Sequence, residues 1–370
     1  MALTIVPYLA EHEAAVAAFN ERARTHGAPF GLSKSPVAGW LPKRDGAPVH
    51  REFFLALDGA EVRGGFTLRR QEFWQRGERV LAANYQGPLS EGLWDRRYMM
   101  AGVQMLRAAL RDQPLLYALG MGGLEQPLPK LLASSGWALA PVPFRFRVLR
   151  AGNFLRHIGP LRKVVWRARA MDFLAATGLG TVGFAALHAL RSRLRLDLGC
   201  ASERVAEFGA WADEVWASAR EGCALSAVRD RAAMNALFAE SSDRNLVLRC
   251  TREGRDVGWA VVRSTAMRGD AYFGGMRLGS LVDALAIPGE EGNVAELAVR
   301  HLRGLGNDLV VTNQTHARWL GALRDAGWLA GPSNFIFAAS PKLAEALGPI
   351  ETALPAIHFN RADGDGPIHL

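Results

Sequence analysis

Three residues that can move protons lie at or near the ends of two segments predicted as strands. Tyr85 and Gln86 lie at the end of the first segment, 79–86, and Glu91 follows it. Tyr117 lies in the second segment, 115–121. Phenol and carboxyl groups release or take up protons, so these residue types suit general acid or general base chemistry. Polar residues near strand ends also commonly cap or turn the chain, and this structural alternative stays open.

A second group of residues suits an anion. Arg96, Arg97, Ala101 and Gly102 lie at the head of a predicted helix, 96–111. A helix N-terminus offers unpaired N–H donors and the positive end of the helix dipole, and small residues let a phosphate approach the backbone closely. The alternative is an ordinary, solvated first turn of a helix.

An internal repeat indicates how these groups are positioned. Gly136–Phe146 reads GWALAPVPFRF and Gly327–Phe337 reads GWLAGPSNFIF, so Gly, Trp, Pro and two Phe recur at the same offsets. The segments 54–66 and 246–259, each a strand, a tight turn and a second strand with glycine, repeat with nearly the same displacement. The repeat predicts two similar domains.

The hydrophobic pattern gives both halves the same order of elements. In the first half it predicts strands at 3–6, 53–57, 62–71, 79–86, 115–121 and 138–149, with helices at 11–25, 96–111 and 127–135. In the second half it predicts strands at 195–198, 245–251, 257–264, 277–286, 308–312 and 334–339, with helices at 205–219, 227–240, 294–304 and 316–326. The fold class is therefore α+β, with a mixed, mostly antiparallel sheet flanked by helices in each domain.

This order resembles the GNAT acyltransferase fold over about residues 3–150 and 195–340. The repeated Gly-Trp stands where that family usually has Gly-Phe after its last helix. The resemblance implies an acyl-CoA co-substrate whose pyrophosphate lies at the start of the helix after the fourth strand, under a loop of pattern Gln/Arg-x-x-Gly-x-Gly/Ala. Residues 97–102 keep the arginine and the final glycine of that loop but have Met100 at its centre. The implied cofactor-binding residues are Arg96, Arg97, Ala101 and Gly102.

The resemblance also implies a base for the attacking amine, backbone donors for an oxyanion and an acid for the departing thiolate. The family often places a tyrosine four residues before its Gly-Phe for the last role, but Leu132 and Leu323 occupy those positions here. Tyr85, Glu91 and Tyr117 lie near the place where the thioester would be, and they are the candidate catalytic residues.

The second half offers a weaker site of the same kind. Asp283 and Asn313 occupy places comparable to the candidates of the first half, and His316 starts a helix. The loop before its crossover helix contains Glu290 and Glu291, whose charge would repel a pyrophosphate. We therefore expect CoA to bind the first half.

The segment 151–194 differs in composition from both halves. Its basic residues are Arg156, Arg162, Lys163, Arg167, Arg169, Arg191 and Arg193, with Arg195 just beyond, and its acid is Asp172. They flank 173–190, a stretch without charge except at His188, in which glycines and threonines predict a break into two short helices. An interdomain helical pair, a peripheral membrane contact and a membrane span stay open. The expected domains are 1–150 and 195–345, joined by this linker and followed by a C-terminal tail, 346–370.

Charge and composition narrow the class of partner. The net charge of +8 favours an anionic partner, but no zinc-finger spacing or RNA-binding aromatic signature accompanies the arginines, so nucleic acid is not expected. Three cysteines without metal or redox spacing favour a reducing compartment, and Met1–Ala10 lacks the features of a signal peptide, so a cytoplasmic location is expected. Walker, Rossmann, nucleophile-elbow and His-Glu-x-x-His motifs are absent from the sequence, and no metal is expected.

Tandem GNAT-like halves joined by a helical element also resemble the FemABX-type aminoacyl transferases, which act on cell-envelope precursors. The expected function is acyl-CoA-dependent N-acyl transfer, to an amino sugar or another envelope or polysaccharide precursor. Two alternatives stay open: a catalytically degenerate GNAT pair that serves as a binding or scaffold protein, and a FemABX-like aminoacyl transferase.

Overall fold

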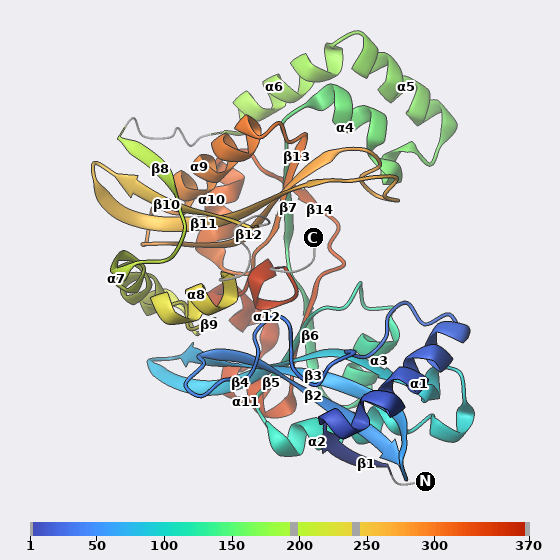
Figure 1. The fold of residues 1–370 in the computed structure, drawn as a ribbon. Coiled ribbons are helices and arrows are strands. Elements are labelled where there is room, and N and C mark those ends of the chain that lie inside the picture. Colours follow the sequence, from blue (N-terminus) through green and yellow to red (C-terminus); the bar gives the residue numbers. More distant parts are fainter. Residues whose placement is uncertain (1–2, 193–198, 239–244, 367–370) are drawn as a thin grey trace. The chain divides into compact units, whose positions relative to one another are not determined.

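The computed structural model describes residues 3–192, 199–238 and 245–366 (Figure 1). The chain divides into two compact units. The first contains Met1–Pro141 and Asn334–Leu354, and the second contains Val142–Ser333 and Pro355–Leu370. Each unit is built on a mixed sheet flanked by helices, so the predicted α+β class is confirmed.

The sheet of the first unit has the strand order β1-β2-β3-β4-β5-β15-β6. These strands are β1 (Thr4–Pro7), β2 (Val49–Asp58), β3 (Glu61–Gln75), β4 (Glu78–Ser90), β5 (Leu116–Gly120), β6 (Ala138–Pro141) and β15 (Ile336–Ala339). The strands β4 and β5 are parallel and the other neighbours are antiparallel.

Helices pack on this sheet through apolar stripes. The first unit contains α1 (Glu13–Thr25), α2 (Ala101–Asp112), α3 (Pro127–Ser134), α11 (Pro341–Leu347) and α12 (Ile350–Ala353). Met105 and Leu106 of α2 pack with Ala83 and Tyr85 of β4, while Phe19 of α1 belongs to a separate apolar cluster. These contacts fix α2 directly beside β4, the strand that precedes it.

The prediction of one helix over 96–111 is wrong at its start. Arg96–Tyr98 forms a separate 3-10 turn, and α2 begins only at Ala101. The side chain of Asp95 accepts a hydrogen bond from the backbone N–H of Arg97, which caps this turn and separates it from the helix.

The sheet of the second unit has the same pattern, β14-β7-β13-β12-β11-β10-β8, with β12 and β13 parallel. Its strands are β7 (Phe144–Val148), β8 (Cys200–Val205), β10 (Leu246–Arg252), β11 (Arg255–Ala266), β12 (Arg277–Ala286), β13 (Leu309–Asn313) and β14 (Leu329–Gly331), and β9 (Leu225–Ala227) pairs with β16 (Ile357–His358) beside it. The strand predicted at 195–198 lies outside the described residues.

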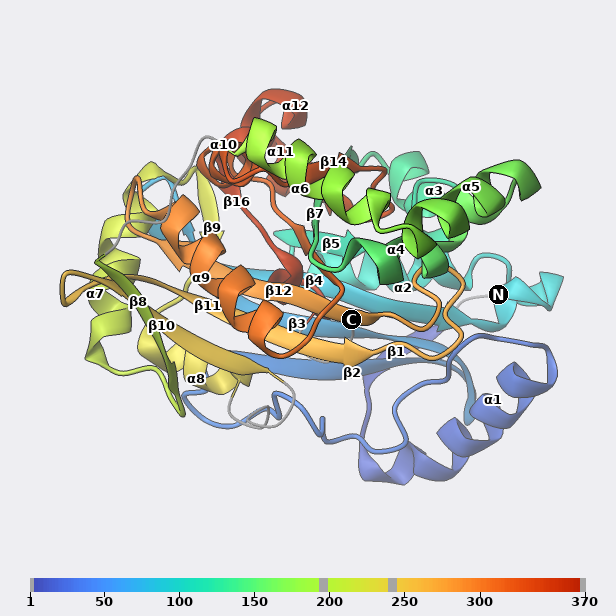
Figure 2. The same ribbon diagram turned by 90° about the horizontal axis from the view of Figure 1, so that it is seen from above.

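Helices also flank the second sheet. The second unit contains α4 (Ala151–His157), α5 (Val165–Ala176), α6 (Leu179–Arg191), α7 (Ala210–Ala219), α8 (Arg231–Phe238), α9 (Glu291–Gly304) and α10 (Ala317–Asp325). Figure 2 shows α9 lying along β11 and β12, where its apolar stripe packs. The helix predicted at 205–219 begins only at Ala210, and the one predicted at 227–240 is described from Arg231 to Phe238.

The last strands of the two sequence halves are exchanged. The strand β7, which follows β6 in the chain, lies between β13 and β14 in the second sheet. The strand β15, which follows β14, lies between β5 and β6 in the first sheet. The prediction of one last strand at 138–149 is therefore wrong, and each unit combines strands from both halves. Residues 346–370, expected as a tail, contribute α12 to the first unit and β16 to the second.

Val142 and Pro143 disfavour a tight hairpin between β6 and β7. Only Val142 and Pro143 separate these strands. A two-residue hairpin needs positive φ at one or both central residues, and proline fixes φ near −65°. The chain therefore continues in an extended direction, and the place beside β6 is taken by β15.

The repeated Gly-Trp has the same structural role in both units. Gly136 (φ 81°) and Gly327 (φ 79°) end α3 and α10 in the left-handed conformation that favours glycine. The N–H of Trp137 then bonds the carbonyl of Leu132 at 3.1 Å, and Trp328 makes the equivalent bond at 2.9 Å. Trp137 and Trp328 are 5% and 3% exposed, so both are buried directly after the helix that they follow.

Candidate functional site

The strands β4 and β5 of the first unit part from each other part-way along their length. Within the described chain they pair only at Ala83–Leu116 and Asn84–Tyr117, although β4 continues to Ser90 and β5 to Gly120. We call the last pair, Asn84–Tyr117, the vertex of the splay. Beyond it, the backbone N–H and C=O groups that the two described strands turn toward each other form no ladder of hydrogen bonds. An extended chain that carries amide groups can pair with strand edges of this kind.

One face of the sheet at this vertex is polar although it is buried. Six polar side chains from β3, β4 and β5 are less than 10% exposed: Thr67, Arg69, Gln71, Asn84, Gln86 and Tyr117. Asn84 pairs in register with Arg69 on one side and with Tyr117 on the other. Side chains of these polar types are uncommon at buried sheet positions, so this polar stripe is a candidate functional surface.

Tyr117 lies at the vertex, on the polar face. Its hydroxyl group lies 3.0 Å from Nη2 of Arg69, which donates to it, and its ring makes an edge contact with Phe73. Because the guanidinium can only donate, the phenol oxygen is the acceptor of this bond. This arrangement suits a proton donor.

Tyr85 lies on the opposite face of the sheet, since it follows Asn84 in the strand. It packs in the apolar core beneath α2, with its ring 5.3 Å from that of Phe66. Burial raises the pKa of Tyr85 far above its ordinary value, and its hydroxyl has no hydrogen-bond partner among the described residues. Tyr85 and Tyr117 therefore flank the vertex from two sides and do not form a pair.

Glu91 is bound in an ion-pair cluster. Its Oε1 accepts from Nε of Arg22 at 2.6 Å and its Oε2 from Nη1 of Arg63 at 2.9 Å, and its side chain is 3% exposed. Both carboxylate oxygens are therefore occupied. The structure gives Glu91 a role in joining α1 to β3 and β4, and it does not bring Glu91 together with Tyr117.

The residues predicted to bind the cofactor lie at and before the start of α2. Ala101 and Gly102 form its first turn, which no described side chain caps. Arg96 is exposed, whereas the guanidinium of Arg97 is bonded to Asp95, with Nη2 at 2.6 Å from Oδ2. The turn therefore keeps an uncapped helix start next to an exposed cation, as an anion site requires.

A glycine loop follows β5 directly at the parted end. Gly120, Met121, Gly122 and Gly123 all have positive φ, of 102°, 59°, 74° and 112°. Positive φ is uncommon for a residue such as Met121, and glycines elsewhere in the loop make the conformation accessible. At its three glycines the loop offers backbone without side chains on the β5 side of the splay.

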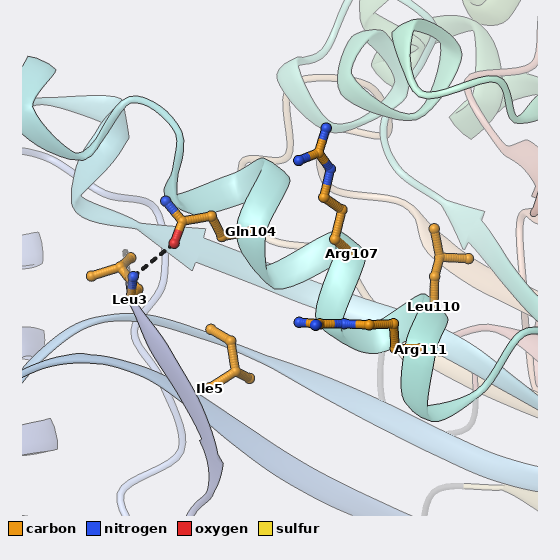
Figure 3. A pocket seen from close by; sticks show the side chains of 6 residues that line it. All are labelled: Leu3, Ile5, Gln104, Arg107, Leu110 and Arg111. Atoms are coloured by element: carbon orange, nitrogen blue, oxygen red, sulfur yellow. Dashed lines mark hydrogen bonds between the residues drawn. The ribbon is translucent and has the colours of Figure 1, made fainter. Parts of the chain in front are cut away.

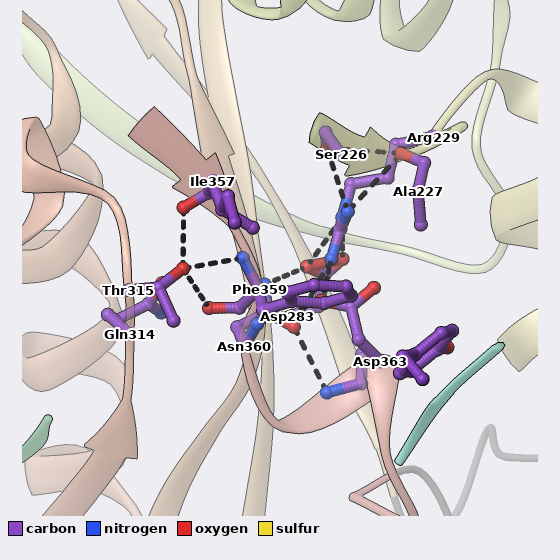
Figure 4. A network of polar contacts seen from close by, with 12 residues as sticks. Ser226, Ala227, Arg229, Asp283, Gln314, Thr315, Ile357, Phe359, Asn360 and Asp363 are labelled. Carbon is purple, nitrogen blue, oxygen red and sulfur yellow. Dashed lines mark hydrogen bonds and ion pairs between the residues drawn. The ribbon is translucent and has the colours of Figure 1, made fainter. Parts of the chain in front are cut away.

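The second unit has a splay as well, but its own C-terminal segment fills it. The strands β12 and β13 pair only from Leu278–Leu309 to Ser280–Val311. Beyond that point residues 357–363 bond to both strands. Figure 4 shows the bonds of this segment to Asp283 of β12 and to Thr315, just after β13. Asn360 donates to Asp283 of β12 at 2.5 Å, and Arg361 donates to Asn313 of β13 at 3.1 Å. The two residues predicted from this half therefore bind the protein's own chain.

Arg229 is the centre of the same buried network. It donates through Nε to Asp283 at 3.1 Å and through Nη2 to Asp363 at 2.7 Å. Burial alone would lower the pKa of Arg229, but the two carboxylates outweigh it and raise the pKa. Burial raises the pKa of Asp363 despite the neighbouring guanidinium. The network is closed on itself and has the character of a structural core.

Side chains also occupy the helix start that corresponds to the pyrophosphate loop in the second unit. Glu291 accepts from the N–H of Gly289 at 3.0 Å, and Glu290 accepts from Arg252 at 2.6 Å. His316 caps α10 by accepting from the N–H of Arg318, and burial lowers its pKa. Carboxylates at this position stand where a phosphate would need donors.

A separate hollow of about 450 Å³ lies between α2 and the edge strand β1 (Figure 3). It is lined by Leu3, Ile5, Gln104, Arg107, Leu110 and Arg111. Gln104 accepts a hydrogen bond from the N–H of Leu3 at 2.7 Å and so ties the two walls together. None of the predicted site residues lines this hollow.

Sequence reasoning missed two functional features. Arg69 is hidden in a predicted strand, and the signal that could have found it is a run of polar residues, Arg69 to Glu72, in a strand with partners on both sides. The C-terminal filling of the second splay has no local signal, because its partners Asp283 and Asn313 are distant in sequence.

No protein-family model matches the sequence, and no curated protein is similar to it in sequence. Solved structures are similar in fold. A conserved protein of unknown function from Enterococcus faecalis, described as a probable N-acyltransferase, aligns with a TM-score of 0.52 at 10% identity over 94% of this chain and 75% of its own. A GCN5-related N-acetyltransferase from Anabaena variabilis aligns with a TM-score of 0.55 at 10% identity over 93% and 74%. The chain therefore has a GNAT-like fold, built from two mixed sheets flanked by helices.

Proposed function

We propose that this protein transfers an acyl group from acyl-CoA to an amine, and that the reaction takes place at the β4–β5 splay of the first unit. The observation that carries the proposal is the vertex of this splay, where Tyr117 and Arg69 are bonded on a buried polar face. The corresponding splay of the second unit is filled by residues 357–363. The first unit is thus the better candidate for the working site.

The parted strands suit the pantetheine arm of CoA. This arm is extended and carries two amide groups, which can bond to the backbone edges beyond Asn84 and Tyr117. Its pyrophosphate would then lie at the uncapped start of α2, where Gly102 is only half-buried and the exposed Arg96 supplies charge. The acyl length is left open by this arrangement.

The chemistry needs three groups. A neutral amine nitrogen attacks the thioester carbonyl and forms the C–N bond, backbone N–H groups of the parted strands stabilise the oxyanion, and the C–S bond breaks as the thiolate takes a proton. Tyr117 is our candidate for that proton, since its hydroxyl lies at the vertex on the polar face and is held there by Arg69. Glu91 is not assigned as the base because two arginines hold both its oxygens. The amine loses its proton to a base that we do not assign.

For the acceptor, we propose an amino sugar or another envelope or polysaccharide precursor, on the basis of the resemblance to FemABX-type transferases stated above. An aminoacyl transfer of the FemABX kind is the variant of this proposal with a different donor. A binding measurement distinguishes the two reactions, because acyl-CoA must bind for N-acyl transfer but not for aminoacyl transfer.

A second function is favoured by one observation, the filled splay of the second unit. If the first splay also fails to take CoA, the pair serves as a binding or scaffold protein. Calorimetry with CoA, acetyl-CoA and longer acyl-CoAs separates these readings. We expect binding at or below millimolar concentration, followed by thiol release in a screen of amine acceptors; no binding at millimolar cofactor would sink the acyl-CoA proposal.

A further inference from the structure

The helices α5 and α6 leave large apolar side chains exposed. Trp166, Phe173 and Val182 are 67%, 61% and 67% exposed, and Val165, Leu179 and Leu190 are also more than half exposed. Exposed helix faces of globular proteins normally carry polar residues. A gathering of this kind on one short segment marks an interaction surface.

The exposed apolar residues of α5 are distinct from those that pack it on the unit. Met171 and Ala175 pack toward the apolar cluster that contains Phe154 of α4. Trp166 and Phe173, seven residues apart, lie on the opposite side of the helix, as the helical period requires. The helix α5 therefore has one apolar stripe that packs on the second unit and another, with Trp166 and Phe173, that is exposed to solvent.

The same division holds in α6. Gly180 faces α4 so closely that a Cβ atom there would lie 2.4 Å from Leu155, and the ring of Phe184 meets that of Phe154 at 5.6 Å. The side that points away from α4 carries Val182 and a row of alanines without any charge. Both helices thus present their uncovered faces away from the same element, α4, as Figure 1 shows.

Basic residues surround this apolar surface. Lys163, Arg167 and Arg169 are exposed at the start of α5, and Arg191 is exposed at the end of α6. The acid of the segment, Asp172, is paired with Arg162 at 2.7 Å, which removes its charge as a source of repulsion. Apolar side chains flanked by cations match the two layers of a bilayer interface, acyl chains beneath anionic headgroups.

We propose that α5 and α6 form a docking surface for an anionic lipid bilayer, which the two helices enter from one side only. Among the described residues no single helix is long and apolar enough to cross a bilayer. The two helices pass that test only as a pair, and they are bent by 87° at Gly178. A bent pair whose inner side packs on α4 suits the plane of the interface, with Trp166 and Phe173 at the acyl boundary and the cations at the phosphates.

Flotation of the full-length protein with vesicles tests the proposal. We expect binding to vesicles of phosphatidylcholine with about one third phosphatidylglycerol, little binding to phosphatidylcholine alone, and release as salt rises from about 0.1 M to about 0.5 M. Arg167→Glu should weaken binding about fivefold or more. Arg255→Glu, which changes an exposed arginine at the start of β11, is the matched control and should bind as the wild type does.

The apolar part of the surface has its own variant. Trp166→Ser with Phe173→Ser should abolish flotation. Tyr272→Ser, which removes an exposed ring outside α5 and α6, should not. Melting curves show that each variant is folded. Equal binding to neutral vesicles, no binding to either kind, or a dimer that the Trp166→Ser, Phe173→Ser variant dissociates would each overturn the proposal. The last outcome would assign the surface to a second copy of the chain.

Discussion

The hydroxyl of Tyr117 and the guanidinium of Arg69 meet at 3.0 Å although their strands, β5 and β3, are not neighbours. The bond passes over Asn84 of the intervening strand β4, which is in register with both residues. It marks the point where β4 and β5 begin to part. The phenol of Tyr117 therefore lies on the polar face at the point where the gap between the strands begins.

Replacement of Tyr117 by Phe tests its role as proton donor. We expect kcat to fall about a hundredfold or more, with the KM for acyl-CoA little changed, because the loss affects only the departing thiolate. Tyr85→Phe is the control, since its hydroxyl lies on the other face without a described partner. Equal losses in both variants would contradict the assignment.

Charge reversal before α2 tests the cofactor site. Arg96→Glu and Arg97→Glu should each weaken CoA binding about tenfold or more, equivalent to about 1.4 kcal/mol. The physical reason is repulsion between the new carboxylate and the pyrophosphate. Calorimetry with CoA measures the effect, and Glu290→Ala in the second unit should change it little. The opposite ranking would move the site to the second unit.

Glu91→Gln separates a structural role from a catalytic one. The substitution removes the negative charge between Arg22 and Arg63, and we expect unfolding to become easier by about 1–3 kcal/mol. The turnover rate of the folded enzyme should stay close to that of the wild type. Urea denaturation and thiol-release kinetics give the two quantities, and a large loss of kcat with unchanged stability would restore Glu91 as a base candidate.

Arg229→Met should destabilise the second unit strongly. It leaves Asp283 and Asp363 buried without their cation, a change that typically costs about 3–5 kcal/mol. The pKa of Asp363 is already raised by burial, so the native chain holds its proton more tightly than the unfolded chain does. Native stability from this group therefore falls as pH rises through the raised pKa.

Loss of the guanidinium strengthens that pH dependence, because protonation becomes the only way to neutralise the two acids. The deficit of Arg229→Met should be largest at neutral pH and shrink as pH falls toward the raised pKa. Chemical denaturation at several pH values measures it. The control is Arg249→Met, which breaks two ion pairs that are more exposed to solvent. It should lower the free energy of unfolding by about 1 kcal/mol or less. A deficit that grows on acidification would contradict the account.

Division of the chain tests the strand exchange. Fragment 1–192 retains β6 but lacks β15, so we expect it to be poorly folded alone and to fold when it is produced together with fragment 199–370. Val142→Asn with Pro143→Gly allows a two-residue hairpin, through which β7 could pair beside β6. This variant of fragment 1–192 should show cooperative unfolding alone. A wild-type fragment that folds by itself would contradict the argument from Pro143.

The sequence determined the repeat, most of the order of elements and the C-termini of the two helices before the Gly-Trp pairs, because these depend on local patterns. The glycines at 136 and 327 fix helix C-termini through their own φ angles, and the tryptophans after them follow into the core. Hydrophobic periodicity likewise placed β4, β5 and α2, and with them the neighbourhood of Tyr85 and Tyr117.

Tertiary structure alone decided which sheet receives each last strand. The edges beside β5 and beside β13 offer the same kind of unpaired backbone groups, so a local pattern cannot distinguish them. It also decided which polar groups are free to act: Glu91 met Arg22 and Arg63, and Asp283 met Arg229 and Asn360, all from distant parts of the chain. Charge pairing acts through space and leaves no spacing in the sequence to read.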